Sequence, residues 1–246
     1  MSGVRRLLTP ARVLLAGLAG AQVAFGSGGR PRPPAATRAM VLLMTATSTA
    51  EALDARGARR GGLVLGVAAG LGFGTELIGV RTGRPFGHYA YSDRLGPRLG
   101  GVPLLAAAAW AMMARPAWVT AGWISGRRVI RVPLAAAALT AWDVFLDPRM
   151  AREGYWQWPG GGRYEGVPAS NFAGWFVTGL GVFTGAALVD GTPPDPDDDV
   201  ALALYVWTWI GEGVANALLW RRPRTAAAGT AAMGAIALPA LRRRLS

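Results

Sequence analysis

Asp143 and Asp147 have the type and spacing that suggest acid chemistry, since residues four apart lie on one face of a helix. Pro148 follows at once, and because the residue before a proline disfavours the helical conformation, we expect the helix to end at Asp147. The negative end of the helix dipole, apolar surroundings and the second carboxyl group all favour keeping at least one of the pair protonated. A protonated carboxyl group in an apolar pocket can act as a general acid toward a hydrocarbon. The alternative is that each aspartate pairs with an arginine or accepts backbone hydrogen bonds.

Three further polar side chains are expected at the same end of the fold, because the apolar segments that carry them run in the matching direction. Glu76 lies near the end of one such segment, Glu212 in the second half of another, and Asn171 at the start of a third. An ionisable group in the middle of a bilayer costs about 2.5–3.5 kcal/mol, so it usually has a partner or a function. We therefore take this cluster as the candidate site.

Apolar segments separated by short charged stretches make up most of the sequence. The chain has 246 residues, of which 52% are hydrophobic and 16% are charged. We expect seven or eight membrane-crossing helices over residues 9–27, 39–55, 62–80, 101–119, 129–147, 168–189, 200–220 and 225–241. The last of these segments is short and rich in alanine, and an interfacial position is the alternative for it. The expected fold class is all-α, a polytopic transmembrane helical bundle forming a single domain over residues 1–246.

The first apolar segment follows Arg5 and Arg6 and therefore resembles a signal peptide. No clean small-residue cleavage site follows it, and seven more candidate segments come after it. We therefore expect the segment to be retained as a helix.

The charge distribution favours a lipid bilayer over nucleic acid as a partner. All 26 basic residues are arginine, the net charge is +12, and the arginines form short runs beside apolar segments. Such runs are typical of residues that anchor helices at lipid headgroups. No basic face with interleaved aromatic residues is apparent, so we expect no nucleic-acid binding. These features predict an integral protein of the cell (plasma) membrane.

Metal and thiol chemistry would have few side chains to use. The chain has no cysteine and a single histidine, His88, which excludes disulfides, thiolate metal sites and two-histidine metal sites within one chain. The acidic run from Asp195 to Asp199 is more typical of a solvated loop, and Glu51 and Asp54 are expected at the membrane interface. We therefore expect no metal site.

Two long segments between the apolar blocks, residues 81–100 and 148–167, are dense in aromatic residues, glycine and proline. Two predicted crossings lie between them, so both fall on one side of the membrane, the side of the acidic cluster. Their candidate aromatic residues are Tyr89, Tyr91, Trp156 and Trp158, with Trp175 in the next apolar segment. An aromatic belt at the headgroup level is the alternative. His88, in the first of these segments, is equally consistent with a structural hydrogen-bond donor and with a base.

Two stretches carry a resemblance to a known family, namely GHYAYSDRLGPRLGGVPL over residues 87–104 and TAWDVFLDPRMAREGYWQWPGGGRYEGVPASNFAGW over residues 140–175. They resemble the membrane carotenoid hydratases of the bisanhydrobacterioruberin and gamma-carotene hydratase type, often labelled "carotenoid biosynthesis protein". The resemblance covers about residues 70–220. Members of the family are polytopic and are thought to hydrate the end of a linear carotenoid.

The resemblance implies protonation of a terminal alkene, a tertiary carbocation, and water addition to give a tertiary alcohol. Such a reaction needs a positioned acid, aromatic faces beside the cation and one water, and we expect it to use no cofactor. As hypotheses, Asp143 or Asp147 supplies the acid, Glu76 is instead the acid or takes a proton from the water, and Asn171 orients the water. The residues expected to contact the substrate are His88, Tyr89, Tyr91, Trp156, Trp158, Asn171, Trp175 and Glu212. The expected partners are a linear carotenoid, water, the bilayer and other enzymes of the carotenoid pathway.

Three other functions fit part of the pattern. A magnesium-dependent membrane prenyltransferase acting on an isoprenoid lipid would use the Asp143–Asp147 motif, but such enzymes need a second Asp-rich motif, and no apolar segment holds one. A proton-coupled transporter would also bury carboxyl groups, although no second copy of the 143–171 pattern indicates paired halves. A non-catalytic carotenoid-binding membrane protein is the third alternative.

Overall fold

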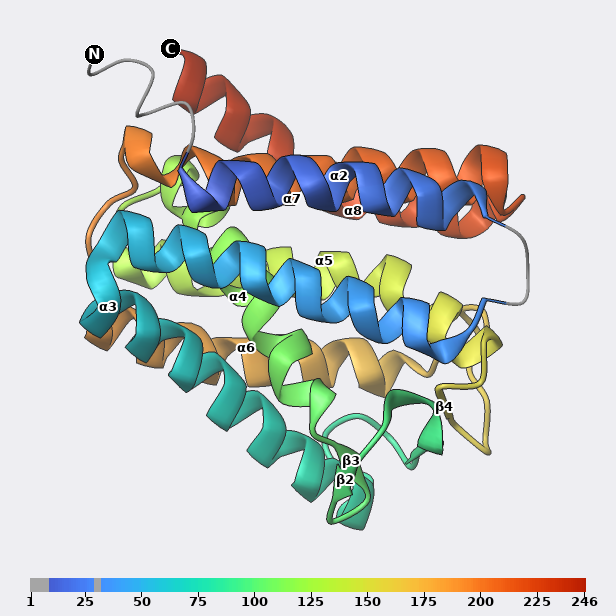
Figure 1. Cartoon of the computed structure of the whole chain (residues 1–246). Coiled ribbons are helices and arrows are strands. Elements are labelled where there is room, and N and C mark those ends of the chain that lie inside the picture. Colours follow the sequence, from blue (N-terminus) through green and yellow to red (C-terminus); the bar gives the residue numbers. More distant parts are fainter. Residues whose placement is uncertain (1–8, 29–31) are drawn as a thin grey trace.

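Seven long helices build most of the part of the chain that this computed structural model describes, residues 9–28 and 32–246. They are α2 (Pro10–Ser27), α3 (Pro34–Thr82), α4 (Leu105–Ile124), α5 (Arg128–Arg152), α6 (Ala169–Val189), α7 (Asp199–Val214) and α8 (Pro223–Leu245). Figure 1 shows them stacked in layers, with α2, α7 and α8 on one side and α6 and the C-terminal half of α3 on the other. The all-α class is therefore confirmed. Arg5 and Arg6 lie outside the described residues.

Four helical segments within the described residues are long and apolar enough to cross a membrane. They are Pro34–Thr82, Arg128–Arg152, Ala169–Val189 and Pro196–Leu219. The last of these joins a short 3₁₀ turn, η2 (Pro196–Asp198), to α7 and to one turn of π-helix, η3 (Ala215–Leu219). These segments fit a membrane protein, while the count of seven or eight crossings stays a prediction.

Helix α3 contains both of the segments predicted at 39–55 and 62–80, joined by an elbow instead of a loop. Gly57 forms the elbow with a φ of 74°, a backbone conformation that favours glycine. A Cβ atom on Gly61 would lie 2.2 Å from the carbonyl oxygen of Ala52, so the two arms approach as closely as bare backbone allows. Figure 1 shows the arms running away from this elbow, the second of them toward the short strands. Glu76 belongs to this second arm.

Helix α5 does not end at Asp147, and that prediction is wrong. The helix continues through Pro148 to Arg152. A proline inside a helix removes the hydrogen bond to the carbonyl four residues earlier, here that of Val144. The hydroxyl of Tyr164 donates to that carbonyl at 3.0 Å, which supplies the missing partner. Asp147 therefore lies in the helix interior and not at the negative end of a helix dipole.

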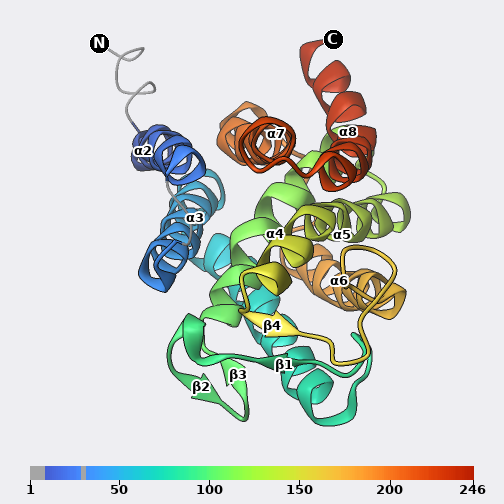
Figure 2. The ribbon, with the colours of Figure 1, turned by 90° about the vertical axis from the view of Figure 1, so that its right-hand side faces the viewer.

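The two aromatic loops lie on the same side of the bundle, as predicted from the two crossings that separate them in the sequence. Strand β1 (Ala90–Tyr91) pairs antiparallel with β4 (Trp156–Gln157), and Tyr91 stands opposite Trp156. A second pair, β2 (Arg98–Leu99) with β3 (Val102–Pro103), follows a short 3₁₀ turn, η1 (Asp93–Leu95). Figure 2 shows the four short strands gathered beyond α5 and α6, away from α7 and α8.

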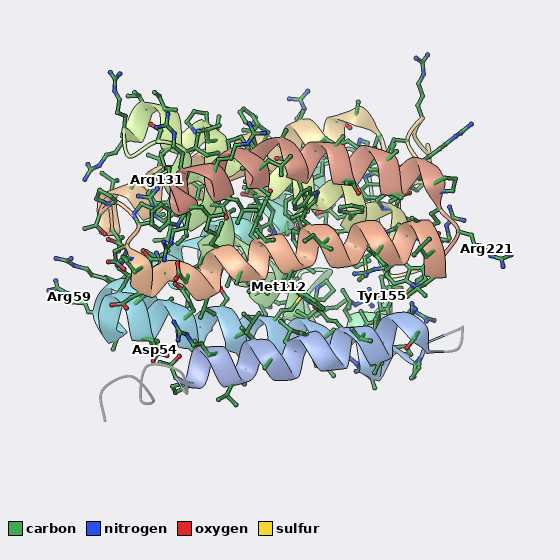
Figure 3. The ribbon with its side chains drawn as sticks, turned by 90° about the horizontal axis from the view of Figure 1, so that it is seen from above. Asp54, Arg59, Met112, Arg131, Tyr155 and Arg221 are labelled. Carbon is green, nitrogen blue, oxygen red and sulfur yellow. The ribbon has the colours of Figure 1, made fainter. Side chains whose placement is uncertain are left out.

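Buried ion pairs join the elements at the opposite end of the bundle, where Figure 3 labels Asp54, Arg59 and Arg131. Arg115 of α4 donates to Glu51 of α3 at 3.0 Å and also to Asp198, and both carboxylates are almost fully buried. Arg56 at the elbow pairs with Asp198 as well. Asp198 is thus no part of a solvated loop, and that prediction is wrong for this residue. Glu51 is buried against Arg115 at this end of the bundle, and its position at the membrane interface stays a prediction.

Candidate functional site

Glu76 accepts three hydrogen bonds at the loop end of the bundle. The hydroxyls of Tyr91, at 2.9 Å, and Tyr89 donate to Oε2, and the indole nitrogen of Trp110 donates to Oε1 at 3.1 Å. The glutamate is only 5% exposed. Three donors around one buried carboxyl group form a site built to hold an acidic side chain in a fixed orientation.

Local chain geometry explains how the two tyrosines reach Glu76. The second arm of α3 ends at Thr82, and Gly83 caps it in the left-handed conformation, with a φ of 73°. The chain then turns back, and strand pairing of β1 with β4 holds Tyr91 in place beside the helix that it has just left.

Burial affects the ionisation of both phenols. It raises the pKa of Tyr89 above its ordinary value, and the neighbouring Glu76 raises it further. The pKa of Tyr91 is raised well above its ordinary value for the same two reasons. Both tyrosines therefore keep their protons at neutral pH and act as hydrogen-bond donors to Glu76.

Asp143 and Asp147 form a second acidic group, tied together by one amide. Nδ2 of Asn171 donates to Oδ2 of Asp143 at 2.9 Å and to Oδ2 of Asp147. Trp156 donates from its indole nitrogen to Oδ1 of Asp147 at 3.0 Å. Oδ1 of Asp143 is buried and has no hydrogen-bond partner among the described residues. A proton shared between the two carboxyl groups would satisfy this oxygen and relieve their mutual repulsion.

Glu76, Asp147 and Asn171 line one cavity of about 50 Å³. This volume is enough for a few water molecules. Asp143 does not line the cavity and lies behind Asp147, on the same face of α5. The two acidic groups thus reach the same space from different helices, α3 and α5.

Aromatic rings form about half of the remaining wall of this cavity. Trp110 stacks on Trp175 with a centroid separation of 4.2 Å. The ring of Tyr91 meets that of Trp156 edge-on at 5.5 Å, and Tyr89 lies 6.0 Å from Trp158. Rings arranged in this way offer both faces and edges to whatever occupies the cavity.

The structure brings most of the predicted site residues together. Those that line the cavity are Glu76, Tyr89, Tyr91, Asp147, Trp156, Trp158, Asn171 and Trp175. Sequence reasoning missed Trp110, which lies in an alanine-rich segment outside the two aromatic loops and the acidic motif. Within the described residues, no group of three histidine, aspartate or glutamate side chains could hold a metal ion.

His88 and Glu212 do not join this cluster. His88 is exposed, and its ring covers Gly83, where a Cβ atom would come within 2.6 Å of it. Glu212 pairs with Arg149 at 2.8 Å and lines a separate cavity beside α7. Both residues lie at the expected end of the bundle. The loop leaves His88 exposed, and the face of α7 that carries Glu212 points away from the acidic cavity.

Comparison with known proteins adds a family relationship. Residues 36–236 match the family model described as "Carotenoid biosynthesis protein". Over 128 residues the chain is 34% identical to bisanhydrobacterioruberin hydratase from Haloarcula japonica. The aligned region covers 49% of this chain and 43% of that relative. The match therefore spans less than half of the relative's length. No solved structure matches the chain.

Proposed function

We propose, on the premise that the chain belongs to the carotenoid biosynthesis protein family, that it hydrates the terminal carbon–carbon double bond of a linear carotenoid to a tertiary alcohol. The hydratase name of the relative from Haloarcula japonica supports this choice. The single observation that carries it is the meeting of Asp147 and Glu76 on the wall of one aromatic cavity.

Asp147 is the proposed proton donor to the alkene. It lines the cavity, whereas Asp143 lies behind it and bonds to the same Asn171 amide. Two carboxyl groups this close retain a shared proton more readily than either would alone. Asp147 presents that proton to the hydrocarbon, and Asp143 and Asn171 fix its orientation.

The cation that forms on protonation lies among aromatic rings. A positive charge is attracted to the faces of tryptophan and tyrosine rings, and the effect is strongest where water is excluded. Trp156, Trp158 and Trp175 all border the cavity and can serve in this way. Glu76, as a carboxylate, adds an opposite charge on the facing wall.

Glu76 is the proposed base for the attacking water. Its three donors match a carboxylate that carries no proton. One water O–H proton passes to Glu76 while the oxygen bonds to the tertiary carbon, so the proton lost by Asp147 is matched by one gained at Glu76. Proton exchange through the water of the cavity returns the site to its starting state. The overall change is addition of water, with no redox step, and we propose that no cofactor is needed.

The proposed setting is the plasma membrane, with a carotenoid dissolved in the bilayer and other enzymes of the pathway nearby. The apolar helices support a membrane location. The carotenoid substrate follows from the family.

Expression in a host that makes lycopene tests this proposal. The wild-type protein is expected to yield a carotenoid heavier by one water, detected by chromatography and mass spectrometry. Asp147→Asn is expected to give none, whereas Asp93→Asn, at an exposed carboxylate of the loop, serves as the matched control and keeps full activity. Lycopene left unchanged by the wild type, or product formed equally by Asp147→Asn, would rule the mechanism out.

A further inference from the structure

A second, larger cavity of about 390 Å³ lies between α2, the first arm of α3 and α7. Its walls are mostly apolar, and they include Met40 and Met44 of α3 and Trp207 of α7. The lining residues of α7 and η3 run from Trp207 to Leu219. At the rise of a helix, that stretch is about 18 Å long. The cavity is therefore elongated along the bundle.

The second cavity adjoins the acidic one. Val41, Met112, Leu146 and Met150 line both of them and therefore stand between the two spaces. Figure 3 places Met112 near the middle of the bundle, between the two ends. Asp147 follows Leu146 directly and lines the acidic cavity but not the second one.

The outer lip of the second cavity is apolar and exposed. Val23, Ile210, Val214 and Leu219 border it, and each is about half exposed. Figure 2 shows α2 at the edge of the bundle, beside α3 and α7. In a membrane, a lip of this composition opens toward the lipid chains and not toward water.

Polar groups on the walls of the second cavity are paired with one another. Trp207 donates to Gln22 at 2.7 Å, and Arg149 donates to Glu212 at 2.8 Å. These pairs leave the wall with little need for a polar ligand, which suits a hydrocarbon occupant.

We propose that this second cavity binds the chain of a linear polyene, which reaches it laterally from the bilayer between α2 and α7. The polyene passes between the side chains that the two cavities share, Met112 and Leu146 among them, so that its end group lies at Asp147 while the far part of the chain remains in lipid. This assignment rests on the proposed function for the identity of the end-group reaction, but the binding of the chain can be measured without any reaction.

Gly211 offers a way to fill the cavity. It lies on the cavity wall, and a Cβ atom built there has no other atom within 4 Å, so a phenylalanine would project into open space. Gly181 of α6 is the matched control, because it is exposed, lies outside both cavities and has equally open surroundings. The two substitutions therefore add the same side chain to a membrane helix, once inside the cavity and once outside it.

The experiment expresses wild type, Gly211→Phe and Gly181→Phe in a lycopene-producing host and purifies each in detergent. Retained carotenoid per protein, read from the visible and ultraviolet absorbance, is expected to fall about ten-fold or more in Gly211→Phe and to stay at the wild-type value in Gly181→Phe. Gly211→Leu, with a smaller side chain, is expected to lie between, and it carries the test if Gly211→Phe does not fold.

Equal carotenoid retention by Gly211→Phe and wild type, or no retention by the wild type, would overturn the assignment of this cavity. Retention of unreacted lycopene by the wild type, with loss in Gly211→Phe, would support the cavity while refuting the proposed hydration. The two proposals thus fail separately.

Discussion

The hydroxyl of Tyr164 donates a 3.0 Å hydrogen bond to the carbonyl of Val144, the carbonyl that Pro148 leaves without its helical partner. Burial raises the pKa of Tyr164 to about 12, so the hydroxyl remains a donor at neutral pH. One loop side chain thereby lets α5 continue past Asp147 and keeps the aspartate pair on a regular helix.

Tyr164→Phe is expected to lower stability by about 1–3 kcal/mol, because it leaves a carbonyl unsatisfied. In a Pro148→Ala background the restored backbone N–H can bond Val144 instead, so the same substitution should cost much less. Thermal unfolding of the four proteins in detergent measures this coupling as a double-mutant cycle. If Tyr164→Phe costs as much in both backgrounds, the hydroxyl does not serve the role assigned to it.

The hydrogen bond from Tyr164 also explains why the predicted end of α5 at Asp147 was wrong. The proline rule gives the usual end of a helix, and only the fold reveals that a tyrosine 16 residues further on compensates. The lengths of the apolar segments correctly predicted the helices. The even number of crossings between the two aromatic loops correctly placed both loops on one side.

The number of crossings along the chain places a residue at one end of the bundle, but it does not say which way that face of the helix points. For that reason Glu212 was grouped with Glu76, although it faces a different cavity and pairs with Arg149. The same limit hid the partners of Asp198, whose run of acidic neighbours looks solvated in sequence. Trp110 was missed because a tryptophan within an alanine-rich segment carries no sign of the carboxylate that its indole nitrogen meets.

The aspartate pair predicts an unequal response to neutral substitution. Asp147→Asn removes the acid that lines the cavity and is expected to lower the hydration rate about 10²–10⁴-fold. Asp143→Asn removes only a partner of Asp147, and its loss should be smaller, on the order of ten-fold. Product formed from lycopene in membranes, normalised to protein, measures both. A larger effect at Asp143 than at Asp147 would reverse the assigned roles.

The raised pKa of Tyr89 is expected to make the folded protein less stable in alkali. Its pKa is raised in the folded protein by burial and by Glu76, whereas the unfolded chain ionises it near the ordinary value of about 10. Below that pH both states hold the proton and the group has no effect on the pH dependence of stability. Above it the unfolded state loses the proton first, so stability falls by up to about 1.4 kcal/mol per pH unit for this group.

Tyr89→Phe should therefore show a shallower decline than wild type above pH 10, even though its stability at neutral pH is lower. Unfolding temperatures measured between pH 8 and 11 compare the two slopes. Parallel curves for the two proteins would mean that Tyr89 ionises in the folded state as easily as in the unfolded chain.

The ion pairs at the far end of the bundle predict an effect on stability without an effect on chemistry. Arg115 is 1% exposed and bonds both Glu51 and Asp198. Arg115→Met would leave Glu51 buried without its bonded counter-ion and would leave Asp198 with Arg56 alone. Such a loss typically costs about 3–5 kcal/mol.

Arg244→Met is the matched control, because its pair with Asp199 is about one-third exposed, and exposed ion pairs contribute little to stability. At a temperature where both variants are folded, both should hydrate lycopene at the wild-type rate, since neither arginine lines the acidic cavity. A fall in rate for folded Arg115→Met, in proportion to its loss of stability, would mean that the elbow of α3 transmits strain to Glu76. In that case the two ends of the bundle would act as one unit, because the second arm of α3 runs from the elbow directly to the site.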